Sequence, residues 1–410
     1  MQTDLPVTGN TERTRPENRA FYPALDGLRA IAFLLVFGQH YVTFPWGWSG
    51  VNVFFVLSGF LITGILFDSR NDPHRVRNFY VRRALRIFPL YYGVILAVVL
   101  AYPLFHWRWS LYWLAWPFYM ANYLPFISQR FTVDGGHLQL AAYAWLRPAA
   151  SQLTFFFGHF WSLCVEEQFY FLWPWIVFRV HSRRALIWIC ATVVVLDPLL
   201  RVFTQHHAAA WMLHANLLQD ATPFQLDSLL LGGLIALLLR GPKPDRYFAI
   251  GKVIGACAAL LMAAAFVAGV IRTYPLNWRT YYIYPSWEFT WGLTLINFLA
   301  ASAILCSLRP FGVLYRTLSF KPLRWIGRIS YGAYIFFDIF HSFYWGATLA
   351  LGNSIAFVAD HIIFFQAILG FVCTLAISWF SFEYYESRFL NLKERWTILP
   401  ESEPVAELRT

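Results

Sequence analysis

The chain has 410 residues, of which 58% are hydrophobic and only 13% are charged, and its formal net charge is +10. A soluble globular domain normally has about 25% charged residues, so the composition excludes that class and indicates a membrane protein with several spans. A basic protein can bind nucleic acid, but the cations here stand in short loops between apolar segments, where membrane topology explains them. The five cysteines form no CxxC pair, so we expect no disulfide framework and no metal site.

Ten apolar segments follow one another along the chain, each near the ~20 residues that cross a bilayer. They cover 26–44, 51–67, 88–105, 160–178, 185–203, 224–240, 250–271, 286–307, 325–349 and 358–382. An eleventh apolar segment, 109–127, is rich in Trp, Tyr and Pro, which suits an interfacial or re-entrant position. We therefore leave it out of the spans.

The distribution of Lys and Arg favours ten spans with both termini in the cytoplasm. The predicted inside loops carry the cations, whereas the outside loops 45–50, 204–223 and 350–357 contain neither Lys nor Arg. One long segment, 106–159, is then outside. The expected fold is all-α: a membrane helical bundle of about ten spans. Its expected parts are a disordered cytoplasmic tail (1–20), a membrane domain (21–395) and a second cytoplasmic tail (396–410).

The first span carries three ionisable residues on one helical face, Asp26, Arg29 and His40. Arg29 and His40 are eleven positions apart, and eleven steps of about 100° return to within roughly 20° of the starting direction. A charge inside a membrane helix is costly and usually faces a partner or a wet cavity, so this face is a candidate site. The alternative is structural, with Asp26 and Arg29 at the interface and His40 in packing.

Three arginines, Arg82, Arg83 and Arg86, stand on one side of a helical turn just before the third span. The arginine fork suits bidentate phosphate binding, which predicts a phosphate clamp at the cytoplasmic boundary. The same residues also suit stop-transfer charge and contact with lipid headgroups. The residues alone leave both interpretations open.

Polar residues in the second span are candidates for packing and for support of the first span. Asn52 lies near the outer end, at about the height of His40, and we expect a hydrogen bond between them. Ser58 precedes Gly59 at the middle of the span, where small residues let helices approach closely.

The fourth span contains two adjacent carboxylates, Glu166 and Glu167. Inserting either charged carboxylate into the membrane costs free energy. Adjacent helical residues point about 100° apart, so we expect one to meet an arginine and the other to face a cavity. The alternative is a structural ion pair. Asp227 in the sixth span and Tyr331 in the ninth favour structural roles when each is taken alone.

Together these pieces resemble the acyltransferase-3 family of integral membrane O-acyltransferases. They occur in the family's order: residues 25–31 (LDGLRAI) with His40, residues 50–62, residues 82–89 (RRALRIFP), residues 160–163 (FWSL) with 165–170 (VEEQFY), Leu226 with Asp227, and Ser330 with Tyr331. The chain departs from the pattern at Asn52, where the family often has Asp. It departs again near Phe337, where the family often has His and this chain offers Asp338 and His341.

The resemblance implies transfer of an acyl group, usually acetyl, from acyl-CoA to a hydroxyl group of a glycan, lipopolysaccharide, peptidoglycan or small molecule. It implies that His40 is the general base and that Arg29 stabilises developing negative charge or holds the donor. Glu167 would orient His40 or line the acceptor path. The implied phosphate-binding and supporting residues are, respectively, Arg82, Arg83 and Arg86, and Asp26, Asn52, Ser58, Glu166, Asp227 and Tyr331. No metal is needed, and a bacterial inner membrane is the expected location.

Two other classes of protein fit the same residues. A proton-coupled transporter of a glycan lipid or metabolite would use Arg29, His40 and Glu167 as a proton relay. A non-catalytic receptor would not bind coenzyme A.

Overall fold

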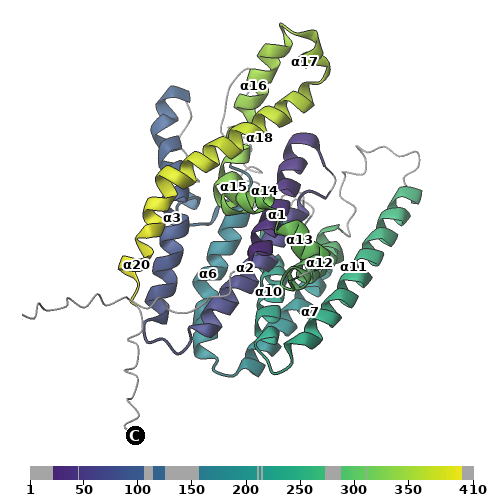
Figure 1. Cartoon of the computed structure of the whole chain (residues 1–410). Coiled ribbons are helices and arrows are strands. Elements are labelled where there is room, and N and C mark those ends of the chain that lie inside the picture. The colour runs from purple at the N-terminus through teal and green to yellow at the C-terminus, as the bar shows by residue number, and fades with distance from the viewer. Residues whose placement is uncertain are drawn as a thin grey trace, which may run out of the picture.

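The computed structural model describes residues 22–44, 46–105, 114–124, 157–209, 212–213, 216–272, 288–310 and 312–398. Within these residues every regular element is a helix, and the helices pack into a bundle (Figure 1). The predicted all-α class is therefore confirmed for this part of the chain. The expected tail 1–20, residues 399–410 of the expected tail 396–410, and most of the long segment 106–159 lie outside the described residues.

The elements follow the predicted spans in order. The longer helices are α1 (Pro23–Val42), α2 (Ser49–Asp68), α3 (Arg75–Phe105), α6 (Phe160–Arg179), α7 (Arg183–His207), α10 (Leu226–Leu239), α11 (Pro244–Arg272), α12 (Leu293–Ser307), α15 (Ser330–Ile339), α16 (His341–Gly352) and α18 (Ile362–Ser381). Shorter elements join them: η2 (Ala121–Tyr123), α9 (Leu217–Asp220), η3 (Thr222–Phe224), η4 (Glu288–Gly292), α13 (Val313–Leu318), α14 (Lys321–Arg328), α17 (Ala356–Asp360), η5 (Phe382–Glu386), α19 (Ser387–Asn391) and α20 (Lys393–Trp396).

Six helical segments of the described residues are long and apolar enough to cross a membrane. They are Ser49–Asp68, Arg75–Ala101, Arg183–His207, Pro244–Ala265, Phe289–Ser307 and Ile362–Trp396. The helices α1 and α6 also match their predicted spans in position, with 20 residues each. The chain is thus a helical membrane protein, while ten spans and cytoplasmic termini stay predictions.

The predicted ninth span, 325–349, is not one helix. It is divided among α14, α15 and α16, with breaks at Ile329 and Phe340, where the backbone leaves helical geometry. The first break has a physical reason: α14 carries Lys321, Arg324 and Arg328, and it packs across the start of α1 instead of continuing into α15. The prediction of a continuous span is corrected accordingly.

The third helix begins earlier than its predicted span, at Arg75, so the arginines of residues 82–86 lie within the helix and not before it. The segment 109–127 was left out of the predicted spans. Its described part, residues 114–124, forms turns and the short helix η2.

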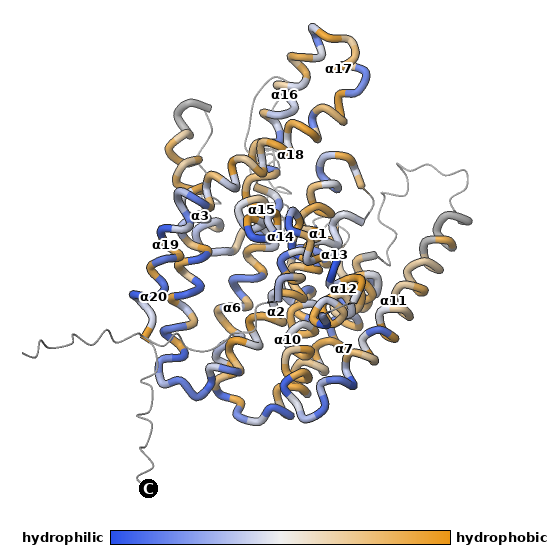
Figure 2. Tube along the Cα trace, in the orientation of Figure 1, coloured by the Kyte–Doolittle hydropathy of each residue, from blue (hydrophilic) through white to orange (hydrophobic). Residues whose placement is uncertain are grey.

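The turns that join α2 to α3, α6 to α7 and α10 to α11 lie at one end of the bundle (Figure 1), and hydrophilic residues gather there (Figure 2). These are predicted inside loops. Their common end agrees with the predicted topology, which requires them to share one face of the membrane.

Glycines allow the central helices to touch at backbone distance. A Cβ atom added at Gly59 of α2 or Gly232 of α10 would overlap a carbonyl oxygen of the other helix. Gly27 of α1 lies in the same way against α13, and Gly327 of α14 against α1. The packing role expected around Gly59 is therefore confirmed, and these contacts fix α1 and α2 at the centre of the bundle.

Candidate functional site

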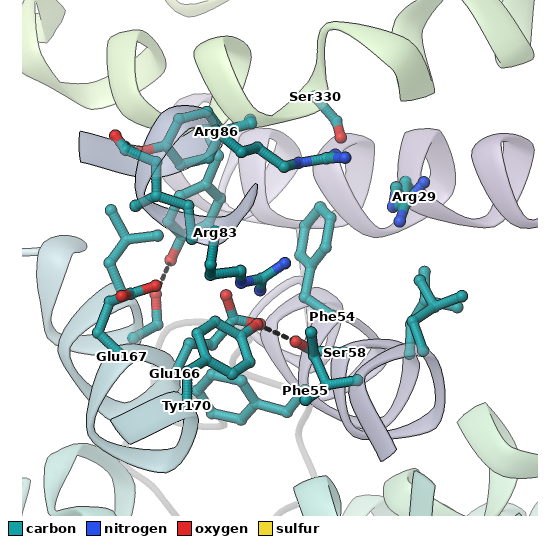
Figure 3. Close-up of a pocket in the computed structure, with 18 of the residues that line it drawn as sticks. Arg29, Phe54, Phe55, Ser58, Arg83, Arg86, Glu166, Glu167, Tyr170 and Ser330 are labelled. Carbon is teal, nitrogen blue, oxygen red and sulfur yellow. Dashed lines mark hydrogen bonds between the residues drawn. The ribbon is translucent and has the colours of Figure 1, made fainter. Parts of the chain in front are cut away.

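A first cavity of about 480 Å³ lies among α1, α2, α3, α6 and α15. Its charged lining consists of Arg29 from α1, Arg83 and Arg86 from α3, and Glu166 and Glu167 from α6 (Figure 3). Charges of both signs thus face one space inside the bundle. Their interactions are stronger there than at a water-exposed surface, because the effective dielectric constant is lower.

Arg83 and Arg86 stand one turn apart on α3, so they share a helical face and both reach this first cavity. The guanidinium carbon of Arg83 lies 3.8 Å from the centroid of the Tyr170 ring, which is a cation–π contact. Arg82 does not line the cavity, because its side chain leaves the helix about 100° away from that of Arg83. Of the three arginines predicted to share one side, two line this cavity together with Arg29 of α1, and phosphate binding stays a prediction.

Arg29 makes the short-range contact that its spacing predicts. Its Nη1 lies 2.8 Å from Oδ1 of Asp26, one turn earlier on α1. The pair is partly buried, and Arg29 also lines the first cavity. Asp26 therefore acts as the local counter-ion of Arg29.

Both adjacent carboxylates of α6 face the first cavity, and both attract Arg83. The prediction that one carboxylate faces a cavity thus holds for both, and which of them pairs with an arginine stays a prediction. Among the described contacts, Glu167 does not reach His40, which lines a different cavity. The expected orienting contact between them is thus absent from this part of the chain.

Ser58 and Tyr331 support the wall of the first cavity. The hydroxyl groups of Ser58 and Tyr170 are hydrogen bonded to each other (Figure 3). The hydroxyl group of Tyr331 donates to the carbonyl oxygen of Ile87 at 2.8 Å. These bonds connect α2 to α6 and α15 to α3, so they link four of the five helices that line the cavity.

A second cavity of about 340 Å³ has a polar lining. His40 from the end of α1, His159 from the residue before α6, and Asp338 from α15 meet at this cavity. Nδ1 of His40 lies 3.3 Å from Oδ1 of Asp338, and Nδ1 of His159 lies 3.5 Å from Oδ2. Asn216, Gln219 and Asp220 complete the polar part of the lining.

The expected hydrogen bond between Asn52 and His40 is not formed. Nδ2 of Asn52 donates to Oδ1 of Asn297 on α12 at 3.0 Å, and the imidazole of His40 faces Asp338. Asn52 and Asn297 are both buried, so each side-chain amide provides a hydrogen-bond partner for the other in place of water.

The two cavities share a wall. Val51 and Tyr334 line both of them. The Tyr334 hydroxyl is hydrogen bonded to Oγ of Ser162 at 2.5 Å, and the two hydroxyl oxygens lie 3.2 and 3.1 Å from the carbonyl oxygen of His159, which accepts from the hydroxyl group that does not donate to the other. Val51 and Tyr334 therefore lie between the arginine-lined space and the space that contains His40.

Arg29 and His40 do not face the same space, although they share a helical face. Arg29 lines the first cavity and His40 the second. At the helical rise of 1.5 Å per residue, eleven residues separate them by about 16 Å along α1. The proposed catalytic pair thus spans the distance between the two cavities.

Asp227 has a structural partner. Arg201 of α7 donates to both of its carboxylate oxygens, at 3.0 and 2.7 Å, and also contacts the carbonyl oxygen of Phe224. The side chain of Arg201 is completely buried. This ion pair joins α7 to α10 and lies outside the linings of both cavities.

Several residues of the site were not singled out from the sequence. His159 and Tyr334 stand in apolar surroundings that carry no local signal of function. Lys393 of α20 is near enough to be repelled by Arg82, Arg83 and Arg86, so the C-terminal helix adds a cation beside the arginines. Its sequence signal is only that of a cytoplasmic tail.

Burial perturbs the pKa values of Asp220 and His159, which both line the second cavity. It raises the pKa of the Asp220 carboxyl well above its usual range. Burial also lowers the pKa of His159, which favours the neutral imidazole. Across the described ranges, no group of three or more His, Cys, Asp or Glu side chains could hold a metal ion.

Known proteins resemble the chain over most of its length. A family model described as an acyltransferase domain, that of acyltransferase-3, matches residues 22–383. Peptidoglycan O-acetyltransferase OatA of Listeria monocytogenes is 28% identical over 356 residues, which cover 79% of this chain and 50% of that protein. A putative peptidoglycan O-acetyltransferase of Bacillus subtilis is 29% identical over 334 residues, or 78% of this chain and 49% of that protein.

A putative O-acetyltransferase of Staphylococcus aureus is 25% identical over 357 residues, which cover 81% of this chain and 53% of that protein. The chain thus spans about half the length of these curated relatives. No solved structure matches it.

Proposed function

Because the chain belongs to the acyltransferase-3 family, we propose that it transfers an acetyl or similar acyl group from acyl-CoA to a hydroxyl group of a cell-surface glycan at the bacterial inner membrane. The names of the relatives support an O-acetyltransferase, and two of them name peptidoglycan. Family membership favours the enzyme over a proton-coupled transporter or a receptor.

The first cavity suits the donor. Arg29, Arg83 and Arg86 present planar guanidinium groups to one space, and such groups bind phosphate oxygens in pairs. A coenzyme A donor carries its phosphates at one end and its thioester at the other. We assign the phosphates to Arg83 and Arg86, so that the pantetheine arm extends toward Tyr334.

The second cavity suits the acceptor. Its lining of imidazole, amide and carboxyl groups can bind the hydroxyl groups of a sugar by donating and accepting hydrogen bonds. His40 lines this cavity, and neutral imidazole is an effective general base near pH 7. The acceptor hydroxyl would therefore meet its base here.

The observation that supports the proposal is the shared wall at Tyr334 and Val51: the two cavities are adjacent, so a donor bound in the first would lie beside an acceptor bound in the second. In the reaction, His40 takes the proton of the acceptor hydroxyl, and the oxygen attacks the thioester carbonyl carbon. The C–S bond breaks, an ester forms, and the coenzyme A thiolate takes up the proton that His40 then releases. Arg29, which lines the donor cavity about 16 Å along α1 from His40, would hold the donor.

The test uses the purified full chain in detergent, acetyl-CoA and soluble peptidoglycan fragments. We expect free coenzyme A thiol and acetylated fragments to form in equal amounts. The variant Arg83→Ala should require much more donor, whereas Arg77→Ala, an exposed arginine of the same helix, should behave as the wild type. Absence of ester would reject the proposal; ester formed only from another acyl donor would reject coenzyme A.

A further inference from the structure

Three helices bring ionisable side chains together at the inner wall of the second cavity. Asp338 of α15 lies between His40 of α1 and His159 before α6, 3.3 Å from one imidazole and 3.5 Å from the other. The ring of Phe337 packs edge-on against both imidazoles, with centroid distances of 4.9 Å. The described lining of this cavity contains neither Lys nor Arg, so the carboxylate of Asp338 has only these two imidazoles as potential cationic neighbours there.

The position of the proton on His159 follows from its other contact. Nε2 of His159 lies 3.1 Å from the carbonyl oxygen of Ile335, which can only accept a hydrogen bond. Neutral His159 therefore carries its proton on Nε2, and its Nδ1 is bare. This Nδ1 is buried and has no hydrogen-bond partner among the described residues. Neutral His159 thus offers Asp338 no proton.

Asp338 must then receive its hydrogen bond from His40. A buried carboxylate without a donor is costly, and Nδ1 of His40 is the remaining imidazole nitrogen beside it. The distance of 3.3 Å is at the long end of the hydrogen-bond range, as is common at sites without substrate. A proton on Nδ1 leaves Nε2 of His40 with a free lone pair, in a side chain that is 35% exposed to the cavity.

We propose that Asp338 is the positioning residue for His40: it holds the imidazole as the Nδ1–H tautomer, with Nε2 as the base, and it stabilises the imidazolium that forms when the acceptor hydroxyl loses its proton. This inference rests on the proposed function. The proton enters and leaves at Nε2, Nδ1 keeps its proton throughout, and Asp338 remains a carboxylate. Asp338 is also the residue that this chain has beside the place where the family often has His.

Other ionisable groups around this cluster do not replace Asp338. Tyr41 of α1 donates its hydroxyl to the carbonyl oxygen of Phe337 at 2.6 Å, and the Tyr334 hydroxyl is bonded to Ser162 and to the His159 carbonyl. His341 of α16 faces the amide of Gln366 at 3.1 Å. Each of these groups is therefore engaged elsewhere.

The experiment compares acetyl transfer by Asp338→Asn and Asp338→Glu with the wild type. Loss of the aspartate behind a catalytic histidine can cost about 10⁴-fold in kcat, because asparagine also stabilises the wrong tautomer. For Asp338→Asn we expect kcat to fall about 10²–10⁴-fold, the range for general-base catalysis, with little change in KM for donor or acceptor. Asp338→Glu should recover part of the rate. Asp360→Asn, an exposed carboxylate at the end of α17, is the matched control and should keep the wild-type rate.

A double-mutant cycle distinguishes positioning from structural damage. If Asp338 acts through His40, Asp338→Asn has no further effect on the residual rate of His40→Ala. An equal loss of rate in both backgrounds, or a single variant with the wild-type kcat, would overturn the inference while leaving the proposed function intact. A wild-type protein that transfers no acyl group would reject the proposed function itself, and this inference with it.

Discussion

Replacing Arg86 by alanine should weaken donor binding without weakening the fold. Arg86 lines the first cavity, where Arg29 and Arg83 both repel it, while Asp26 and Glu386, which do not line the cavity, attract it. A cation held beside two others contributes little to folding. Such a residue is explained by an anionic ligand, because binding sites commonly keep groups that do not stabilise the protein.

The magnitude follows from the chemistry of the contact. A hydrogen bond to a charged group contributes about 1.5–3 kcal/mol, and every 1.4 kcal/mol is a factor of ten, so Kd for acetyl-CoA should rise about 10- to 150-fold. At a donor concentration of about 100 times the wild-type Kd, bound donor stabilises the wild type by about 2.7 kcal/mol. A variant with a Kd about 100-fold higher gains only about 0.4 kcal/mol under the same conditions.

Unfolding of the detergent-solubilised protein, followed with and without acetyl-CoA, measures both quantities. Without donor, Arg86→Ala should unfold at the wild-type temperature or above it, because repulsion is relieved. With donor, it should lose most of the stabilisation that the wild type and the exposed control Arg77→Ala retain. Full donor-dependent stabilisation in Arg86→Ala would refute the phosphate assignment, and a lower unfolding temperature without donor would show that Arg86 is structural.

Four further predictions are open to direct measurement. His40→Ala and His40→Gln should bind acetyl-CoA normally but lose about 10²–10⁴-fold in transfer rate, and near-normal turnover in either would return His40 to a packing role. Gln129→Cys, in the segment outside the described residues, should react with an impermeant thiol reagent in intact cells; labelling only after lysis would reject the topology. Gly59→Ala should cost about 1–3 kcal/mol by overpacking α2 against α10, while Gly312→Ala, which meets no close neighbour, should unfold like the wild type. Burial raises the pKa of Asp220 in the folded protein. The stability that this carboxyl group contributes therefore falls as the pH rises above about 3.9, which is the pKa of an aspartate in the unfolded chain. We expect Asp220→Asn to be more stable than the wild type at pH 7 and equally stable in acid.

Local spacing was sufficient to predict contacts within one helix. The interval between Asp26 and Arg29 predicts that they share a helical face, on which the structure shows an ion pair, and the interval between Arg83 and Arg86 predicts that these two also share a face. The same helical repeat turns the Arg82 side chain about 100° away from that of Arg83, so it also predicts that Arg82 does not face the same cavity. The membrane class and most helix positions follow from apolar length alone.

Contacts between helices could not be predicted in this way. His40, His159 and Asp338 are separated by more than a hundred residues at each step, and no periodicity relates one helix to another. The hydrogen bond between Asn52 and His40 was predicted from their similar depth in the membrane. The side chain of Asn52 instead points toward α12, where it donates to Asn297. The break inside 325–349 depends on the docking of α14 on α1, which only the folded bundle determines.

The wall formed by Val51 and Tyr334 also has a consequence for ion leakage. Suppose that the two cavities open toward opposite faces of the membrane. An open passage between them would then let water and protons cross, and it would dissipate the proton gradient across the membrane. The Tyr334 hydroxyl contacts Ser162 and the carbonyl oxygen of His159, which keeps the aromatic ring between the cavities. In that arrangement the ring would serve as a barrier to protons, so Tyr334→Ala should make the membrane of intact cells more permeable to protons.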